Sequence, residues 1–121
     1  MIKRSRSPDG KLVLRRPAYD PRDYTIAPER LAELQRGVGN WGYDEAMNDR
    51  EGMFKGWIQV ERFRQDGKEW ALLYAVGSET VIEVELKPGG AMGEVRAVPA
   101  ERTYEIAKRM DAKLRPDIIY E

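Results

Sequence analysis

The chain has 121 residues, including 21 Lys and Arg, 21 Asp and Glu, and neither histidine nor cysteine. This length fits one domain, and a 41% share of hydrophobic residues is enough for one core. Without cysteine there is no disulfide framework, thiolate nucleophile or cysteine-ligated zinc, and without histidine no imidazole catalysis. The net charge of zero is divided unevenly, because residues 1–22 carry +5 and the remaining residues −5.

The first 27 residues are predicted to form a basic, proline-rich arm ahead of a single α+β domain over residues 28–121. Prolines in the arm exclude a long helix, because each fixes φ and removes a backbone donor. Residues 7–10 are typical of a turn, and residues 11–15 can follow it as a short strand. Six basic residues of the arm are candidates for contact with nucleic-acid phosphates: Lys3, Arg4, Arg6, Lys11, Arg15 and Arg16.

A short helix is predicted over residues 28–36, where Pro28 suits the first helical position and Leu31 and Leu34 share one face. Gly37 suits the position that ends this helix. A helical turn over residues 44–49 is the next expected element.

The clearest signal is Asp66-Gly67 between two apolar runs, residues 56–64 and 69–76. A type I′ turn needs positive φ at both central positions, and Asp-Gly supplies it, so these runs are predicted to form a hairpin. A two-residue loop places Phe63 opposite Trp70 and, further along, Trp57 opposite Val76. Strands over residues 80–87 and 92–98 are predicted to follow.

Residues 99–115 form the best predicted helix, with acidic residues early and basic residues late, as the helix dipole favours. Glu105 and Arg109 are spaced to pair at i and i+4. The tail after Pro116 is apolar and is expected to pack down or to add an edge strand. The apolar stripe of the helix consists of Thr103, Ile106, Ala107, Met110 and Leu114.

Together these elements predict an α+β fold: an antiparallel three- to four-stranded meander with the long C-terminal helix on one face and a short N-terminal helix. If Gly77-Ser78 is a two-residue loop, one sheet face is aliphatic and suits the C-terminal helix. A three-residue loop would reverse the faces of the third strand. The other side, here called the aromatic–acidic face, carries Trp57, Phe63, Trp70, Leu72, Tyr74, Val76 and Val81 among Gln59, Glu61, Glu83 and Glu85.

Three interpretations of this aromatic–acidic face remain open. The N-terminal helix and the arm could cover it, a second copy could pack on it, or it could bind a flat or cationic ligand. The candidate residues for binding a ligand or partner are Trp57, Glu61, Phe63, Trp70, Tyr74 and Glu83.

The sequence therefore predicts a small non-enzymatic binding protein that acts through the aromatic–acidic face, with an unidentified protein or small molecule as a further partner. It is expected to form a homodimer, either through this face or by exchange of the N-terminal arm. A nucleic-acid-associated protein that uses the basic arm is one alternative. A carboxylate-dependent enzyme, or a binder of flat or cationic small molecules, is the other. No catalytic residue, metal ligand or cofactor is assigned. A cytoplasmic location without a membrane partner is expected, because the longest apolar run has seven residues, 70–76.

Overall fold

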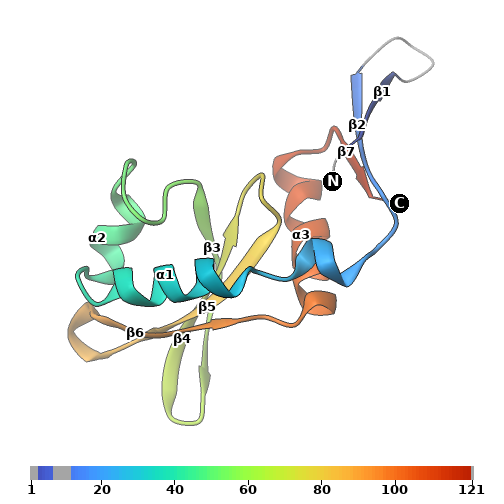
Figure 1. Ribbon diagram of the computed structural model, residues 1–121. Helices are drawn as coiled ribbons and strands as arrows, with labels where there is room; N and C mark the ends of the chain where they lie inside the picture. Colours follow the sequence, from blue (N-terminus) through green and yellow to red (C-terminus); the bar gives the residue numbers. More distant parts are fainter. Residues whose placement is uncertain (1–2, 7–11, 121) are drawn as a thin grey trace.

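The computed structural model describes residues 3–6 and 12–120, and this part of the chain forms two β-sheets and three α-helices (Figure 1). The strands are β1 (Lys3–Arg6), β2 (Leu12–Arg16), β3 (Trp57–Gln65), β4 (Lys68–Ala75), β5 (Thr80–Leu86), β6 (Met92–Ala97) and β7 (Ile118–Tyr120). The helices are α1 (Pro28–Val38), α2 (Tyr43–Asn48) and α3 (Ala100–Leu114), with short 3-10 turns η1 (Pro21–Tyr24) and η2 (Pro88–Gly90). This confirms the predicted α+β fold.

The main sheet is an antiparallel meander with the strand order β3-β4-β5-β6. Its first turn is the predicted one, since Asp66 and Gly67 have φ values of 54° and 76°. The pairing of Phe63 with Trp70 is confirmed, but Trp57 lies opposite Ala75 and not Val76. The reason is a β-bulge at Val60, which adds one residue to β3 and reverses the faces of the residues before it.

The pairing of β4 with β5 follows the register predicted from a two-residue Gly77-Ser78 loop. Leu73 lies opposite Ile82 and Ala71 opposite Val84. The ladder ends one pair earlier than expected, at Ala75 and Thr80, so the connection is a four-residue loop.

The aliphatic face of the main sheet is covered by α1 and α2, which contradicts the prediction that the C-terminal helix packs there. Leu34 and Val38 of α1 share one buried cluster with Leu73 and Ile82 of the sheet. Gln35 fixes α1 to β6, because its side chain donates to Gly93 O at 3.0 Å and accepts from the Val95 amide at 2.7 Å. Trp57 belongs to this cluster as well, because the bulge turns it to this side.

The opposite face of the main sheet is covered by α3. Ile106 and Ala107 of α3 pack with Leu72 and Tyr74 of β4 in a second buried cluster. Asp111 of α3 also accepts a hydrogen bond from the buried Tyr74 hydroxyl, which would otherwise lack a partner on this face. One part of the predicted arm also contributes, since Tyr24 of η1 joins the same cluster.

The buried stripe of α3 differs from the prediction at its C-terminal end. Leu114 is 49% exposed, whereas Asp111 is fully buried. The predicted pair of Glu105 with Arg109 is absent from the ion pairs of the described residues. In α1 the helix continues through Gly37, where a Cβ would lie 2.9 Å from Met53 Cε.

The smaller sheet joins the two ends of the described chain. β1 pairs with β2 in antiparallel fashion, and β2 pairs with β7 in parallel, so that Leu14 lies opposite Ile118. The predicted short strand and the predicted edge strand of the tail are both confirmed, while the turn expected over residues 7–10 lies outside the described residues. The paired strands β1 and β2, here called the basic ribbon, extend beyond the body of the molecule (Figure 1).

Candidate functional site

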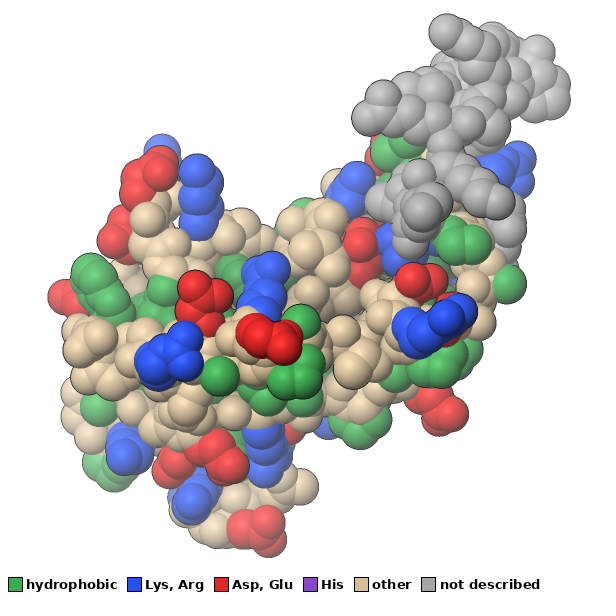
Figure 2. All heavy atoms as spheres, in the orientation of Figure 1, with side chains coloured by type: hydrophobic (Ala, Val, Ile, Leu, Met, Phe, Trp, Pro, Cys, Tyr) green, Lys and Arg blue, Asp and Glu red, His purple; other side chains and the backbone are tan. Residues whose placement is uncertain are grey.

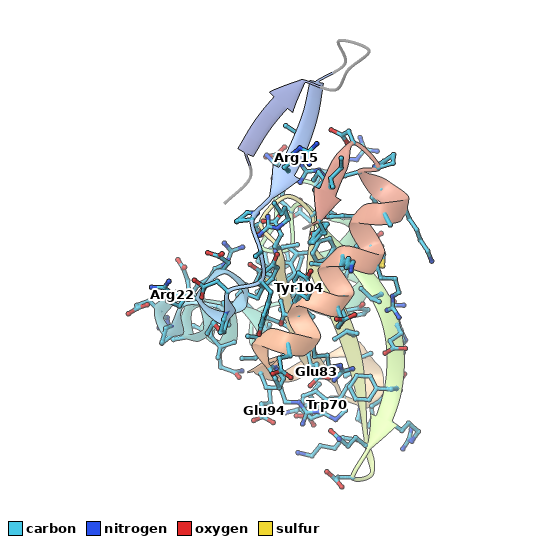
Figure 3. All side chains as sticks on the ribbon, turned by 90° about the vertical axis from the view of Figure 1, so that its right-hand side faces the viewer. Arg15, Arg22, Trp70, Glu83, Glu94 and Tyr104 are labelled. Carbon is cyan, nitrogen blue, oxygen red and sulfur yellow. The ribbon has the colours of Figure 1, made fainter. Side chains whose placement is uncertain are left out.

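The six residues of the predicted binding face do not form an open surface. Tyr74, Trp70 and Glu83 are buried, with 0%, 2% and 5% of their surface exposed. Trp70 and Glu83 lie near the N-terminal end of α3, where the helix crosses the sheet (Figure 3). Phe63 packs at the margin of the α3 cluster, and Trp57 lies on the other face of the sheet. Glu61 is exposed at the edge, but most of the aromatic–acidic face is filled within one chain.

Glu83 is held between two arginines. Arg96 Nε donates to Glu83 Oε1 at 2.7 Å, and Arg102 Nη1 donates to Glu83 Oε2 at 3.1 Å. The Arg96 guanidinium also lies over the ring of Trp70, 3.7 Å from its centroid. Glu61 is more distant, with Oε1 3.9 Å from Arg102 Nη2. Because two positive charges hold the Glu83 carboxylate, this cluster has the character of a buried ion-pair network and not of a general base poised for catalysis.

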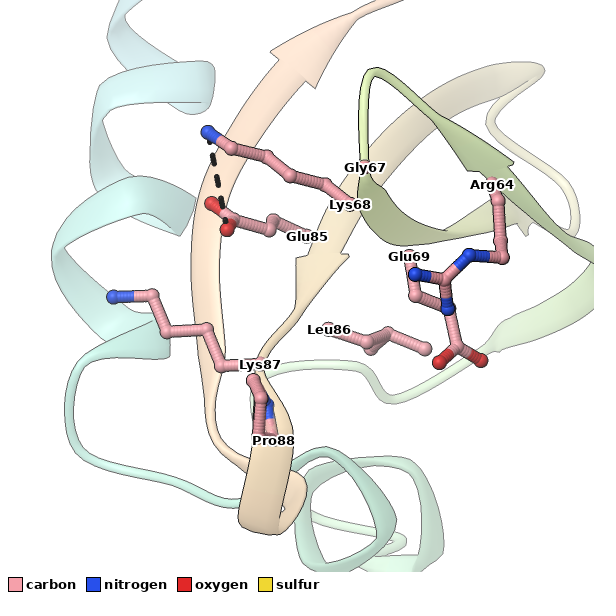
Figure 4. Close-up of a pocket in the computed structure, with 8 residues that line it drawn as sticks. All are labelled: Arg64, Gly67, Lys68, Glu69, Glu85, Leu86, Lys87 and Pro88. Atoms are coloured by element: carbon pink, nitrogen blue, oxygen red, sulfur yellow. Dashed lines mark ion pairs between the residues drawn. The ribbon is translucent and has the colours of Figure 1, made fainter.

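One open pocket lies beside the turn of the β3–β4 hairpin (Figure 4). It encloses about 190 Å³, and its charged side chains come from Arg64, Lys68, Glu69, Glu85 and Lys87. Lys68 Nζ lies 4.0 Å from Glu85 Oε2, so opposite charges already meet inside the pocket. Within the described residues, no group of three or more carboxylates is placed to hold a metal ion.

A second polar cluster lies where the basic ribbon meets the body. Arg16, at the end of β2, is only 2% exposed. Its Nε donates to the Tyr24 hydroxyl at 2.8 Å, and its Nη1 lies 3.1 Å from Glu79 Oε2. Burial alone would lower the pKa of Arg16, but the Tyr24 hydroxyl and the Glu79 carboxylate outweigh burial and raise it. Arg16, predicted as a phosphate contact, is thus a buried anchor of the ribbon.

Asp111 extends this cluster into the core. It accepts hydrogen bonds from the Tyr74 hydroxyl at 2.6 Å and from the Tyr120 hydroxyl at 2.5 Å. The ring of Tyr120 in turn lies 5.6 Å from the guanidinium carbon of Arg16. Burial first, and then the hydrogen bond to the Asp111 carboxylate, raise the pKa of both tyrosines. The residues Arg16, Tyr24, Tyr74, Glu79, Asp111 and Tyr120 are called the anchoring network below.

Sequence reasoning missed the anchoring network for an identifiable reason. Charged residues are rarely fully buried, so Asp111 on a helix and Arg16 on a strand are expected in solvent. One signal was available, since Asp111 follows Ala107 by four residues and therefore lies on the same helix face.

The other predicted phosphate contacts lie along the basic ribbon. Lys3 is opposite Arg15, Arg4 is opposite Leu14, and Arg6 is opposite Leu12. Lys11 lies outside the described residues. Arg15 is exposed beside β7, at the end of the molecule away from Trp70 and Glu83 (Figure 3). In contrast to the ribbon, acidic and basic side chains are intermixed over the face that α1 and α2 present (Figure 2).

Comparisons with known protein families, curated proteins and solved structures find no match for this chain. In the part of the chain that the structure describes, no helix has the length and apolar character needed to span a membrane.

Proposed function

We propose that the protein is a non-enzymatic nucleic-acid-binding protein and that the basic ribbon is its recognition element. The observation that carries this proposal is the pairing of two basic segments in a ribbon that extends beyond the body (Figure 1). A two-stranded ribbon has a width that the major groove of a duplex admits, and Lys and Arg displace counterions from phosphates. The anchoring network supports this role, because it fixes the root of the ribbon to the core.

The distribution of charge also supports contact through the ribbon alone. Residues 1–22 carry +5, and the remainder of the chain carries −5. Phosphates would be attracted to the ribbon and repelled by the body, so few contacts outside the ribbon are expected. Binding is favoured over catalysis because the buried Glu83 carboxylate is already paired with Arg96 and Arg102.

The proposal is tested by measuring the affinity for a short fluorescent DNA duplex by anisotropy at several salt concentrations. Replacing Arg4 and Arg6 by Gln should reduce the slope of log K against log salt by about 1.8, since each phosphate contact contributes about 0.9. The matched control is Lys108→Gln with Arg109→Gln, which removes two exposed charges from α3. For this control variant, the slope of log K against log salt should stay close to that of the wild type.

Two results would contradict the proposal. One is the absence of binding at about 50 mM salt, where charge-driven association is strong. The other is an equal loss of slope in the α3 control, which would mean that the net charge and not the ribbon determines binding.

A second copy of the chain was the other partner predicted from the sequence. Because α3 covers the sheet face from which a homodimer was inferred, a dimer would have to form in another way, such as the predicted exchange of the N-terminal arm. The homodimer stays a prediction, and sedimentation equilibrium tests it: twice the chain mass of 13.9 kDa would support it, and the single mass would contradict it.

A further inference from the structure

Among the described residues, three arginines share one environment, in which the guanidinium lies over an aromatic ring and also pairs with a carboxylate. The guanidinium carbons lie 3.7 to 5.1 Å from the ring centroids, and the ion pairs measure 2.7 to 3.7 Å. A planar guanidinium can stack and form charged hydrogen bonds at the same time, which an ammonium does less well. The three sets are Arg16 with Tyr24 and Glu79, Arg62 with Tyr43 and Glu69, and Arg96 with Trp70 and Glu83.

Aromatic rings and carboxylates also lie together in a surface groove, but no arginine is among the residues that line this groove. A shallow groove of about 380 Å³ is lined by Tyr19, Glu101, Tyr104 and Glu105, here called the tyrosine–glutamate groove. The ring of Tyr19 lies 5.0 Å from that of Tyr104, at an angle of 52° between the planes. Tyr19 is 36% exposed, and its ring also stacks with that of Tyr24, with 5.8 Å between the centroids.

The electrostatics of this groove favour a cation. Glu101 and Glu105 are exposed, and neither is among the ion pairs of the described residues. Partial desolvation first, and then the carboxylates of Glu101 and Asp20, raise the pKa of the Tyr19 hydroxyl. Tyr104 already attracts one cation, since Lys108 Nζ lies 5.9 Å from its ring centroid.

We propose that the tyrosine–glutamate groove binds the guanidinium of an arginine side chain from a partner protein. The guanidinium would stack on Tyr19 and donate hydrogen bonds to Glu101 and Glu105, which completes the environment found three times within the chain. The arginine of a second copy's ribbon is a poorer occupant. Tyr19 follows β2 by only three residues, so a docked +5 ribbon would lie beside the root of another ribbon of the same charge.

The experiment uses the full chain labelled with nitrogen-15 and the peptide acetyl-Gly-Arg-Gly-amide as the probe. We expect saturable chemical-shift changes at the Tyr19 and Tyr104 amides with a Kd of about 1 mM, the weak range expected for one group in an open groove. Replacing arginine by the neutral isostere citrulline should weaken binding at least about tenfold, because the charged hydrogen bonds are lost. A lysine peptide should bind at least about threefold more weakly.

The matched variants remove two exposed carboxylates inside or outside the groove. Glu101→Gln with Glu105→Gln should weaken arginine binding at least about tenfold, whereas Glu33→Gln with Glu94→Gln should leave it unchanged. All four glutamates are exposed, so both variants are expected to keep the native amide spectrum away from the substitutions.

The proposal is overturned if no peptide causes saturable shifts at the groove, or if citrulline or lysine binds as well as arginine. Equal binding by the Glu101→Gln, Glu105→Gln variant would also overturn it. Self-association of the wild-type chain that disappears in this variant would overturn the assignment to a partner protein in favour of a second copy. None of these results depends on whether the basic ribbon binds nucleic acid.

Discussion

Asp111 joins three elements through its two hydrogen bonds, because Tyr74 belongs to β4, Tyr120 to β7 and Asp111 itself to α3. The carboxylate accepts both bonds while it is fully buried. Loss of the proton from either tyrosine would place a second negative charge beside Asp111. The folded state therefore holds the protons of these two hydroxyls more tightly than the unfolded state does.

The consequence is a loss of stability in alkali, which the Tyr120→Phe variant should reduce. The folded pKa of Tyr120 is raised above the unfolded value of about 10, so its contribution is complete below pH 10 and falls as the pH rises above 10. The free energy of unfolding of the wild type should fall relative to that of Tyr120→Phe by about 1.4 kcal/mol per pH unit in this range. Urea denaturation from pH 8 to 11.5 measures the difference, and a constant difference across this range would contradict the expectation.

Single residues also show where prediction from the sequence ends. Asp66 and Gly67 were predictable, because the required positive φ is a local property of the chain. Asp111 and Arg16 were not, because their burial depends on partners that lie 37 and 63 residues away in the sequence. The helix period places Asp111 on the buried face of α3. It does not reveal that the hydroxyls of Tyr74 and Tyr120 donate to the Asp111 carboxylate there.

At the scale of elements, the basic ribbon is held to the body by β7 and by Arg16. The backbone of Leu14 donates to Asp117 O at 3.1 Å, and β7 contributes only three residues to the sheet. With so short a partner strand, the side chain of Arg16 and its contacts with Tyr24 and Glu79 supply much of the attachment.

Replacing Arg16 by Met should therefore destabilise the protein by about 3 kcal/mol, because it leaves the buried Glu79 carboxylate without its near partner. The matched control is Arg22→Met, which breaks an exposed pair with Asp20 and should change the stability little. Chemical denaturation measures both changes. Equal effects of the two substitutions would show that the Arg16 contacts do not anchor the ribbon.

The elements themselves were predicted better than their packing. All four strands of the meander and the helices near residues 28 and 100 were predictable, because turn residues and apolar periods are local signals. The side of the sheet that α3 covers was not, since an amphipathic stripe specifies a face of the helix and says nothing of its partner. The bulge at Val60 was equally hidden, and it alone moved Trp57 out of the predicted site.

At the scale of the whole molecule, stability is concentrated in the main sheet. Residues 70–75 of β4 are all buried, and both sheet faces are covered by helices. The smaller sheet has no comparable core within the described residues. The two sheets should therefore open with different free energies.

Amide hydrogen exchange in the native wild-type protein tests this difference. The amides of β4 and β5 should exchange only through global unfolding, and their exchange should depend steeply on added denaturant. The Leu14 amide, which bonds across to Asp117, should exchange through a smaller opening with a weaker dependence. Identical free energies and denaturant slopes for both sets would show that the two sheets form one cooperative unit.

The parallel pairing of β2 with β7 has a consequence for how the molecule assembles. Leu14 and Ile118 meet only after nearly the whole chain has been brought into a closed loop, and such a contact is entropically costly until the intervening chain has folded. The smaller sheet is therefore expected to form only after the main sheet has folded, so that the basic ribbon is fixed to the body late in folding.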